Sequence, residues 1–128
     1  NALKVAQWLS ADPRVSWVSF PGLEGDKYHA LAEKYMPNGT CGVISFGVPG
    51  GREKVSAFLD HLKMVSIATH VADARSCTLY PAGTTHRQLT EEQLIEAGVG
   101  IDLVRLSCGI ENADDIIADL DQALAAVQ

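Results

Sequence analysis

Residues 103–111, Leu-Val-Arg-Leu-Ser-Cys-Gly-Ile-Glu, constrain the fold more than any other stretch of the chain. They have the pattern of a short strand that stops at a glycine and leads into a helix. Because side chains alternate along a strand, Val104 and Leu106 fall on one face and Arg105 and Ser107 on the other. A half-buried guanidinium is costly unless an anion pairs with it, and its planar donors fit a carboxylate at two points. The stretch therefore predicts that Arg105 holds either an internal Asp or Glu or a bound ligand.

The size and charge of the chain limit the classes of protein to consider. A chain of 128 residues has the length of one domain and can bury its own core. The net charge of −6 and the scattered basic residues disfavour nucleic acid and anionic membranes as partners. No apolar run approaches the roughly 20 residues of a membrane span. An odd number of cysteines, Cys41, Cys77 and Cys108, indicates a reduced, cytoplasmic protein.

The hydrophobic pattern changes between helical and strand periods along the whole chain. Helices are expected from residue 1 to before Asp12 and over residues 26–35, 52–62, 90–98 and 112–127. Strands are expected over residues 14–20, 41–48, 64–69, 76–80 and 103–107. Each helix has one apolar stripe, which predicts an α/β sandwich with one helical layer on a small, mostly antiparallel sheet. The other face of the sheet is then expected to be exposed or covered by something outside this chain.

Local signals refine the helices. Thr90 and Gln93 have the spacing of a capping box, and Asn112 is placed to cap the last helix. The second helix carries a set of large and small apolar side chains on one face, namely Tyr28, Leu31, Ala32 and Tyr35.

A self-contained active site is not visible in the sequence. There is no phosphate-binding loop and no Gly-x-Ser-x-Gly nucleophile motif. Cys77 and Cys108 are expected to be inert thiols, His70 and His86 to be structural, and the spacing of Cys and His does not fit a metal site. The long polar connection over residues 70–85 is typical of a functional loop. The residues thus predict a ligand-contacting surface without catalytic machinery.

Four motifs lie along the chain. They are His-Val-Ala-Asp-Ala-Arg-Ser at 70–76, Pro-Ala-Gly-Thr-Thr-His at 81–86, the stretch 103–111, and Asp-Asp-Ile-Ile-Ala-Asp-Leu at 114–120. Together they resemble the C-terminal domain of the Cys/Met-metabolism family of pyridoxal-phosphate enzymes. Residues 85–89 and 42–46 are most similar to its O-acetylhomoserine sulfhydrylase branch.

The resemblance implies that residues 1–128 are the C-terminal small domain of a longer enzyme of fold type I, the aspartate-aminotransferase-like class. The cofactor, pyridoxal 5'-phosphate, would be bound by a large preceding domain that is absent here. The fragment alone would be inactive, and the whole enzyme is expected to be a cytoplasmic homotetramer.

The resemblance also assigns substrate-binding residues. Arg105 matches the arginine that binds the α-carboxylate of the amino-acid substrate, and Thr85 and the backbone at His70 and Val71 match positions that close over it. His70 stands where many members have serine or asparagine, and Ala72 often replaces a glycine. No catalytic, cofactor-binding or metal-binding residue is expected within the chain.

The reaction implied is replacement of the acetyl group of O-acetyl-L-homoserine by sulfide or a thiol, in methionine and cysteine biosynthesis, with pyridoxal phosphate as electron sink. One alternative is the same domain of a cystathionine γ-synthase, a cystathionine γ-lyase or a methionine γ-lyase. Another is a free-standing amino-acid-binding or regulatory module. A third is a structural interaction domain in which Arg105 has an internal acidic partner.

Overall fold

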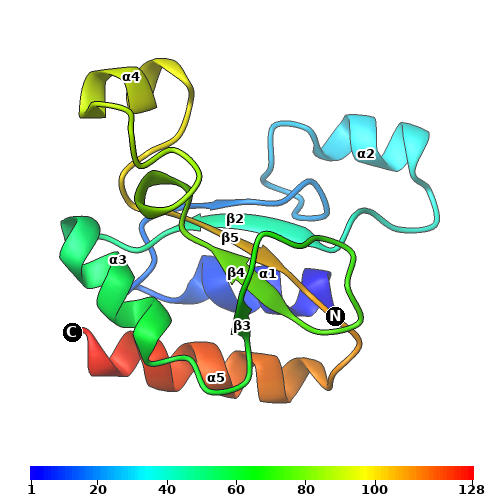
Figure 1. Ribbon diagram of the computed structural model, residues 1–128. Coiled ribbons are helices and arrows are strands. Elements are labelled where there is room, and N and C mark those ends of the chain that lie inside the picture. Colours follow the sequence, from blue (N-terminus) through cyan, green and yellow to red (C-terminus); the bar gives the residue numbers. More distant parts are fainter.

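The computed structural model describes residues 1–128 and contains one five-stranded sheet (Figure 1). In spatial order its strands are β1 (Val18–Ser19), β2 (Val43–Gly47), β5 (Leu103–Ser107), β4 (Cys77–Leu79) and β3 (Ser66–Ile67). Neighbouring strands are antiparallel except for the β3–β4 pair, which is parallel. The strand that carries Arg105 is therefore the central one.

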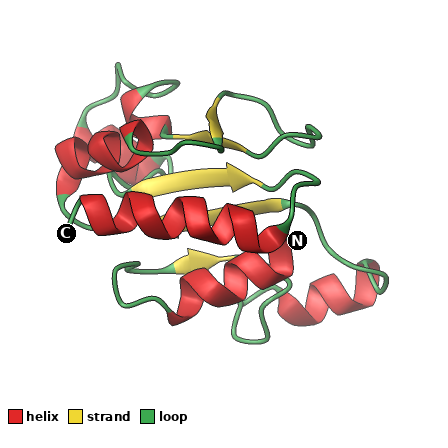
Figure 2. Cartoon of the chain, turned by 90° about the horizontal axis from the view of Figure 1, so that it is seen from below, coloured by secondary structure: helices red, strands yellow, loops and turns green.

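Three helices cover one face of the sheet, as Figures 1 and 2 show. They are α1 (Ala2–Ala11), α3 (Gly51–Asp60) and α5 (Ala113–Ala126). Two shorter helices, α2 (His29–Tyr35) and α4 (Glu91–Glu96), lie away from this layer (Figure 1). No helix is long and apolar enough to cross a membrane. The predicted sandwich, with one helical layer on a mostly antiparallel sheet, is confirmed.

The core lies between the sheet and this helical layer. Ile44 and Phe46 of β2 and Val104 and Leu106 of β5 are fully buried, as the alternation along each strand predicts. Phe46 also meets Phe58 of α3 edge to face, with 6.1 Å between ring centroids. Burying each such side chain stabilises the fold by roughly 1.5–3 kcal/mol. The core thus holds the face of β5 that carries Val104 and Leu106, and Arg105 lies on the opposite face.

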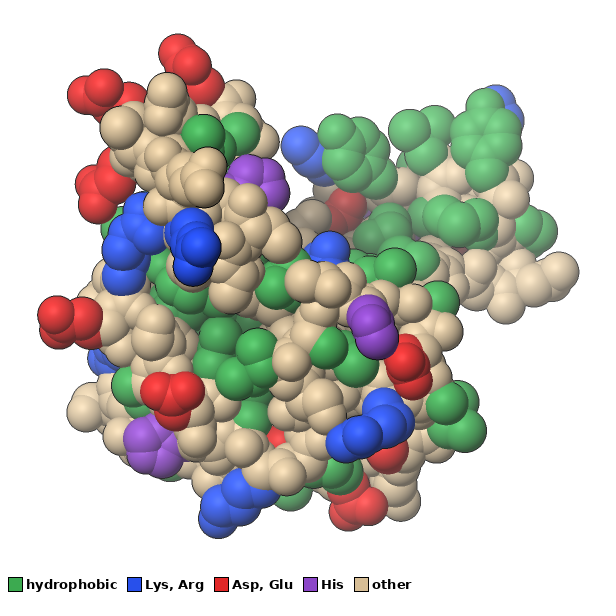
Figure 3. All heavy atoms as spheres, viewed as in Figure 1, with side chains coloured by type: hydrophobic (Ala, Val, Ile, Leu, Met, Phe, Trp, Pro, Cys, Tyr) green, Lys and Arg blue, Asp and Glu red, His purple; other side chains and the backbone are tan.

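The second helix differs from its prediction. It begins at His29 rather than at residue 26, because the Asp26 carboxylate accepts hydrogen bonds from the backbone N–H groups of Phe20 and Tyr28 and holds a turn there. Within the predicted apolar face only Ala32 is buried. The other members are 52–69% exposed, namely Tyr28, Leu31 and Tyr35. Figure 3 shows hydrophobic side chains gathered over this helix.

Four of the five predicted strands are shorter than expected, and two of them are reduced to two residues. The strand predicted over residues 14–20 is reduced to β1, because the backbone N–H and the side chain of Arg14 bond to the Asp12 carboxylate and form a turn. The strand predicted over residues 64–69 is reduced to β3, because Asp119 draws the preceding backbone toward α5.

Asp119 is a buried carboxylate that joins two parts of the fold. It lies on α5 with only 6% of its surface exposed, and it accepts hydrogen bonds of 2.8–2.9 Å from the backbone N–H groups of Lys63, Met64 and Val65. Burial would raise the pKa of Asp119, but these three bonds and one from Gln122 outweigh it and leave the pKa below its ordinary value. The carboxylate therefore stays ionised while it fixes the chain between α3 and β3.

Candidate functional site

Arg105 lies in the middle of the central strand, on the face without helices. Its cross-strand partners are Ser45 of β2 and Leu79 of β4. The side chain is half-buried and its Nη2 donates a hydrogen bond of 3.0 Å to the carbonyl oxygen of Thr69, just after β3. The guanidinium is therefore held near the start of the connection between β3 and β4.

No carboxylate of the chain pairs with Arg105. The five ion pairs of the structure involve other residues, and no Asp or Glu oxygen lies within 4.0 Å of this guanidinium. An arginine has five N–H donors, of which Arg105 uses one within the chain. The alternative of an internal acidic partner is thus not supported, and the free donors can bind an anion.

The connection between β3 and β4 passes the same face of the sheet. The backbone N–H of Ala72 donates a hydrogen bond of 3.1 Å to Oγ of Ser107, two residues after Arg105 on β5. Between the two attachment points lie His70 and Val71, both exposed, whose backbone N–H groups make no hydrogen bond within the chain. Because the Thr69–His70 peptide bond is trans and its carbonyl oxygen faces Arg105, the N–H of His70 points away from the guanidinium. The donors for an anion at this place are therefore those of Arg105 itself.

The side chain of His70 does not take part in this arrangement. Its Nδ1 lies 3.5 Å from Oδ2 of Asp73, and the side chain is 69% exposed. The pKa of Asp73 is lowered, first by a hydrogen bond from the backbone N–H of Arg75 and also by His70. The imidazole of His70 therefore faces Asp73, and the part of His70 in binding a carboxylate stays a prediction.

Thr85 lies on the connection that follows β4. A 3-10 turn, Pro81–Gly83, precedes it, and the hydroxyl of Thr85 is hydrogen-bonded at 2.8 Å to Nδ1 of its neighbour His86. No hydrogen bond joins Thr85 or His70 to Arg105. The role of Thr85 in binding a carboxylate therefore stays a prediction.

Cys77 and Cys108 do not supply an activated nucleophile. Burial raises the pKa of the Cys108 thiol to about 11 and also raises the pKa of Cys77. A thiol with a raised pKa is protonated near neutral pH and reacts slowly. No group of three His, Cys, Asp or Glu side chains is placed to hold a metal ion.

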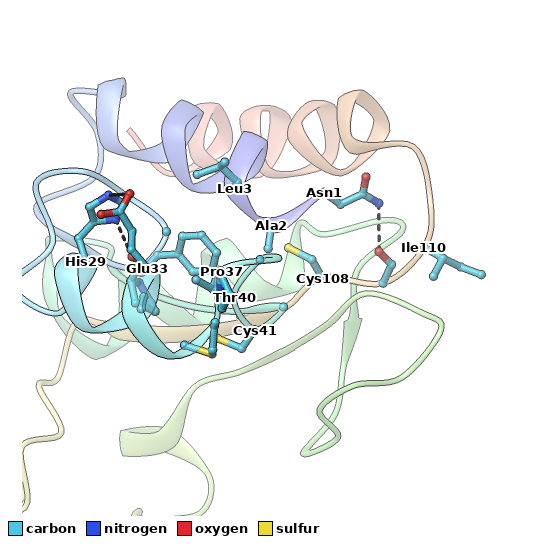
Figure 4. A pocket seen from close by; sticks show the side chains of 18 residues that line it. Asn1, Ala2, Leu3, His29, Glu33, Pro37, Thr40, Cys41, Cys108 and Ile110 are labelled. Atoms are coloured by element: carbon cyan, nitrogen blue, oxygen red, sulfur yellow. Dashed lines mark hydrogen bonds and ion pairs between the residues drawn. The ribbon is translucent and has the colours of Figure 1, made fainter.

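A pocket of about 870 Å³ lies at the start of α1 and was not predicted from the sequence (Figure 4). It lies between the start of α1, helix α2 and the turns that follow β5. Its lining includes Asn1, Phe20, His29, Met36 and Cys108. Neither Arg105 nor the loop over residues 69–72 lines it, so this pocket is separate from the site on β5. Its residues come from four distant segments, and no local motif marks it.

The chain belongs to the Cys/Met metabolism PLP-dependent enzyme family, whose profile matches residues 1–125. Relatives of the chain are named as sulfhydrylases and as homocysteine synthases. It is 47% identical over 125 residues to an O-acetyl-L-homoserine sulfhydrylase of Leptospira meyeri and 48% identical over 124 residues to a homocysteine synthase of Schizosaccharomyces pombe. These alignments cover 97% of this chain but only 28% and 29% of the relatives. The resemblance seen in the sequence is confirmed.

A solved structure agrees with this assignment. The crystal structure of a putative O-acetylhomoserine (thiol)-lyase from Campylobacter jejuni matches with a TM-score of 0.88 and 39% identity. The match covers 97% of this chain and 30% of that one. That protein carries a pyridoxyl-lysine phosphate at a position outside the matched part. The chain thus spans less than a third of the length of these relatives.

The residues present do not fit covalent attachment of pyridoxal phosphate. A lysine that binds a carbonyl group needs a lowered pKa, which burial in an apolar pocket can provide. None of the five lysines is buried, and none lines the pocket of Figure 4. They are Lys4, Lys27, Lys34, Lys54 and Lys63. We therefore expect the lysine that holds the cofactor to lie outside residues 1–128, as the pyridoxyl-lysine of the Campylobacter jejuni protein does.

Proposed function

We propose that residues 1–128 are the C-terminal small domain of a longer O-acetylhomoserine sulfhydrylase and that they bind the α-carboxylate of its amino-acid substrate. The observation that carries the proposal is the guanidinium of Arg105, which has no carboxylate partner within the chain and uses only one of its five N–H donors. The relatives named as sulfhydrylases support this branch over the cystathionine and methionine enzymes.

The central strand makes Arg105 suitable for positioning. Hydrogen-bonded strands on both sides limit the movement of β5, so the direction of the guanidinium is set before the substrate arrives. Two parallel N–H···O bonds to a carboxylate fix its plane as well as its position. Holding the substrate in one orientation lowers the entropic part of the barrier to reaction.

The other residues of this face have smaller parts in the proposal. By the resemblance to the family, the backbone at His70 and Val71 would close over the same carboxylate, and Thr85 would close the site from the connection after β4. The cofactor and its lysine would come from the remainder of the enzyme, so the 128-residue chain alone is expected to be inactive. The whole enzyme is expected to be a cytoplasmic homotetramer that uses sulfide or a thiol.

An assay with two substrates tests this function. The chain extended upstream to its natural start, supplied with pyridoxal phosphate, is expected to form homocysteine from O-acetyl-L-homoserine and sulfide. The 128-residue chain serves as the control and is expected to show no turnover. An analogue without the carboxylate, the acetyl ester of 3-aminopropanol, is expected to lower kcat/KM by about a hundredfold or more, because charge-assisted hydrogen bonds to it are lost. Equal kcat/KM for both substrates would exclude the carboxylate role.

A further inference from the structure

We propose that Ser107 is a positioning residue, which holds the loop over residues 69–72 in the shape that lets the carbonyl oxygen of Thr69 fix the guanidinium of Arg105. The inference rests on the proposed function, since it concerns the same carboxylate site. Ser107 itself is only 1% exposed, so its role would be exerted through the loop and not by contact with the substrate.

The loop is attached to β5 at two points, three residues apart. Arg105 donates to the carbonyl oxygen of Thr69 at 3.0 Å, and Oγ of Ser107 accepts from the N–H of Ala72 at 3.1 Å. Ser107 is paired in the sheet with Val43 on one side and Cys77 on the other, so its hydroxyl is a fixed point. The two residues with unused N–H groups lie between these attachments.

The conformation of Ala72 shows why this attachment matters. Its φ is 57°, which makes it the one non-glycine residue of the chain in the left-handed region. This conformation is unfavourable for an L-residue with a Cβ. The hydrogen bond from the N–H of Ala72 to Ser107, which forms only in this conformation, compensates for the strain. Without the Ser107 hydroxyl, Ala72 is expected to return to a negative φ, and the peptide groups before it would turn away from Arg105.

The remainder of the connection is fastened independently. The carbonyl oxygen of Ala74 accepts from the N–H of Ile110 at 2.9 Å, and both the N–H and the hydroxyl of Ser76 bond to the Glu111 carboxylate. Loss of the Ser107 hydroxyl should therefore change residues 69–72 and leave β4 in place.

The test uses the extended enzyme with O-acetyl-L-homoserine and sulfide. Ser107→Ala is expected to raise KM for O-acetyl-L-homoserine about tenfold and to leave kcat within about twofold. The substitution should weaken binding of the substrate equally in the ground state and the transition state, and so should not slow the chemical step. Ser45→Ala is the matched control. Ser45 of β2 lies on the same face of the sheet as Arg105 and its side chain makes no hydrogen bond, so the substitution should leave KM unchanged.

In the 128-residue chain, Ser107→Ala should speed hydrogen exchange of the Ala72 amide at least about tenfold.

Substitutions at Ala72 test the same contact from the exposed side. Ala72→Pro removes the donor and fixes φ near −65°, so KM should rise as in Ser107→Ala even if the serine variant fails to fold. Ala72→Gly tolerates positive φ, so adding Ser107→Ala to it should raise KM less than about threefold.

The role of Ser107 would be overturned if KM were unchanged in Ser107→Ala while it was raised in Arg105→Lys. If Ser107→Ala does not fold, an unchanged KM in Ala72→Pro decides in the same way. Either result would leave the carboxylate site standing. An unchanged KM in Arg105→Lys would overturn the proposed function itself.

Discussion

Replacing Arg105 with lysine in the extended enzyme is expected to raise KM for O-acetyl-L-homoserine about a hundredfold. Lysine keeps the positive charge, but its ammonium group is a point donor and cannot make two parallel bonds to one carboxylate. The substitution would also remove the hydrogen bond from Nη2 to the carbonyl oxygen of Thr69. Steady-state kinetics over a range of O-acetyl-L-homoserine concentrations measure this effect, which should fall mainly on KM.

Two comparisons make this result specific. Arg87 is exposed and its side chain makes no hydrogen bond or ion pair, so Arg87→Lys should leave KM unchanged. With the analogue that lacks the carboxylate, Arg105→Lys should cost little, because the interaction it weakens is already missing. An Arg105→Lys enzyme with an ordinary KM would show that Arg105 does not bind the substrate carboxylate.

Replacing Asp119 with alanine is expected to lower the free energy of unfolding of the 128-residue chain by about 3 kcal/mol. The substitution leaves the N–H groups of Lys63, Met64 and Val65 without their acceptor, and that of Val65 is buried. It also removes the link between α5 and the segment before β3. Urea unfolding followed by circular dichroism measures the loss as a shift in the midpoint at constant slope.

A control and a pH series separate this effect from a loss of helix charge. Asp115 is exposed in the first turn of α5, so Asp115→Ala should cost less than about 1 kcal/mol. Because the folded pKa of Asp119 lies below its ordinary value of 3.8, its contribution is complete above that pH. The contribution is lost as the pH falls through the folded pKa, so the difference between wild type and Asp119→Ala should shrink there. A difference that is equally large at pH 7 and at pH 2 would contradict this account.

The sequence was most informative where a local pattern decides the structure. The alternation along residues 103–107 placed Arg105 opposite the core-facing Val104 and Leu106, and this is what the structure has. The capping box at Thr90 and Gln93 and the Asn112 cap were also predicted correctly. In these cases neighbours within four residues supply the interactions.

Long-range contacts were beyond the same reasoning. The bond from Ala72 to Ser107 joins residues 35 positions apart. The one sign that residue 72 is left-handed is the glycine that often stands there in the family, and this did not reveal the partner of its N–H group. The bonds to Asp119 span 54–56 positions. A signal was present in that case, because Asp119 falls on the apolar face of α5, between Ile116 and Ala123. The apolar face of α2 was visible in the sequence, but its exposure depends on what surrounds it in three dimensions.

The most direct test of the assignment is a cofactor trap. The 128-residue chain and the chain extended to its natural start are each incubated with pyridoxal phosphate, reduced with borohydride and weighed by mass spectrometry. We expect one lysine adduct on the extended chain and none on the 128-residue chain, because none of its five lysines is buried. A specific adduct on the 128-residue chain, or none on either chain, would contradict the account and favour a free-standing amino-acid-binding module.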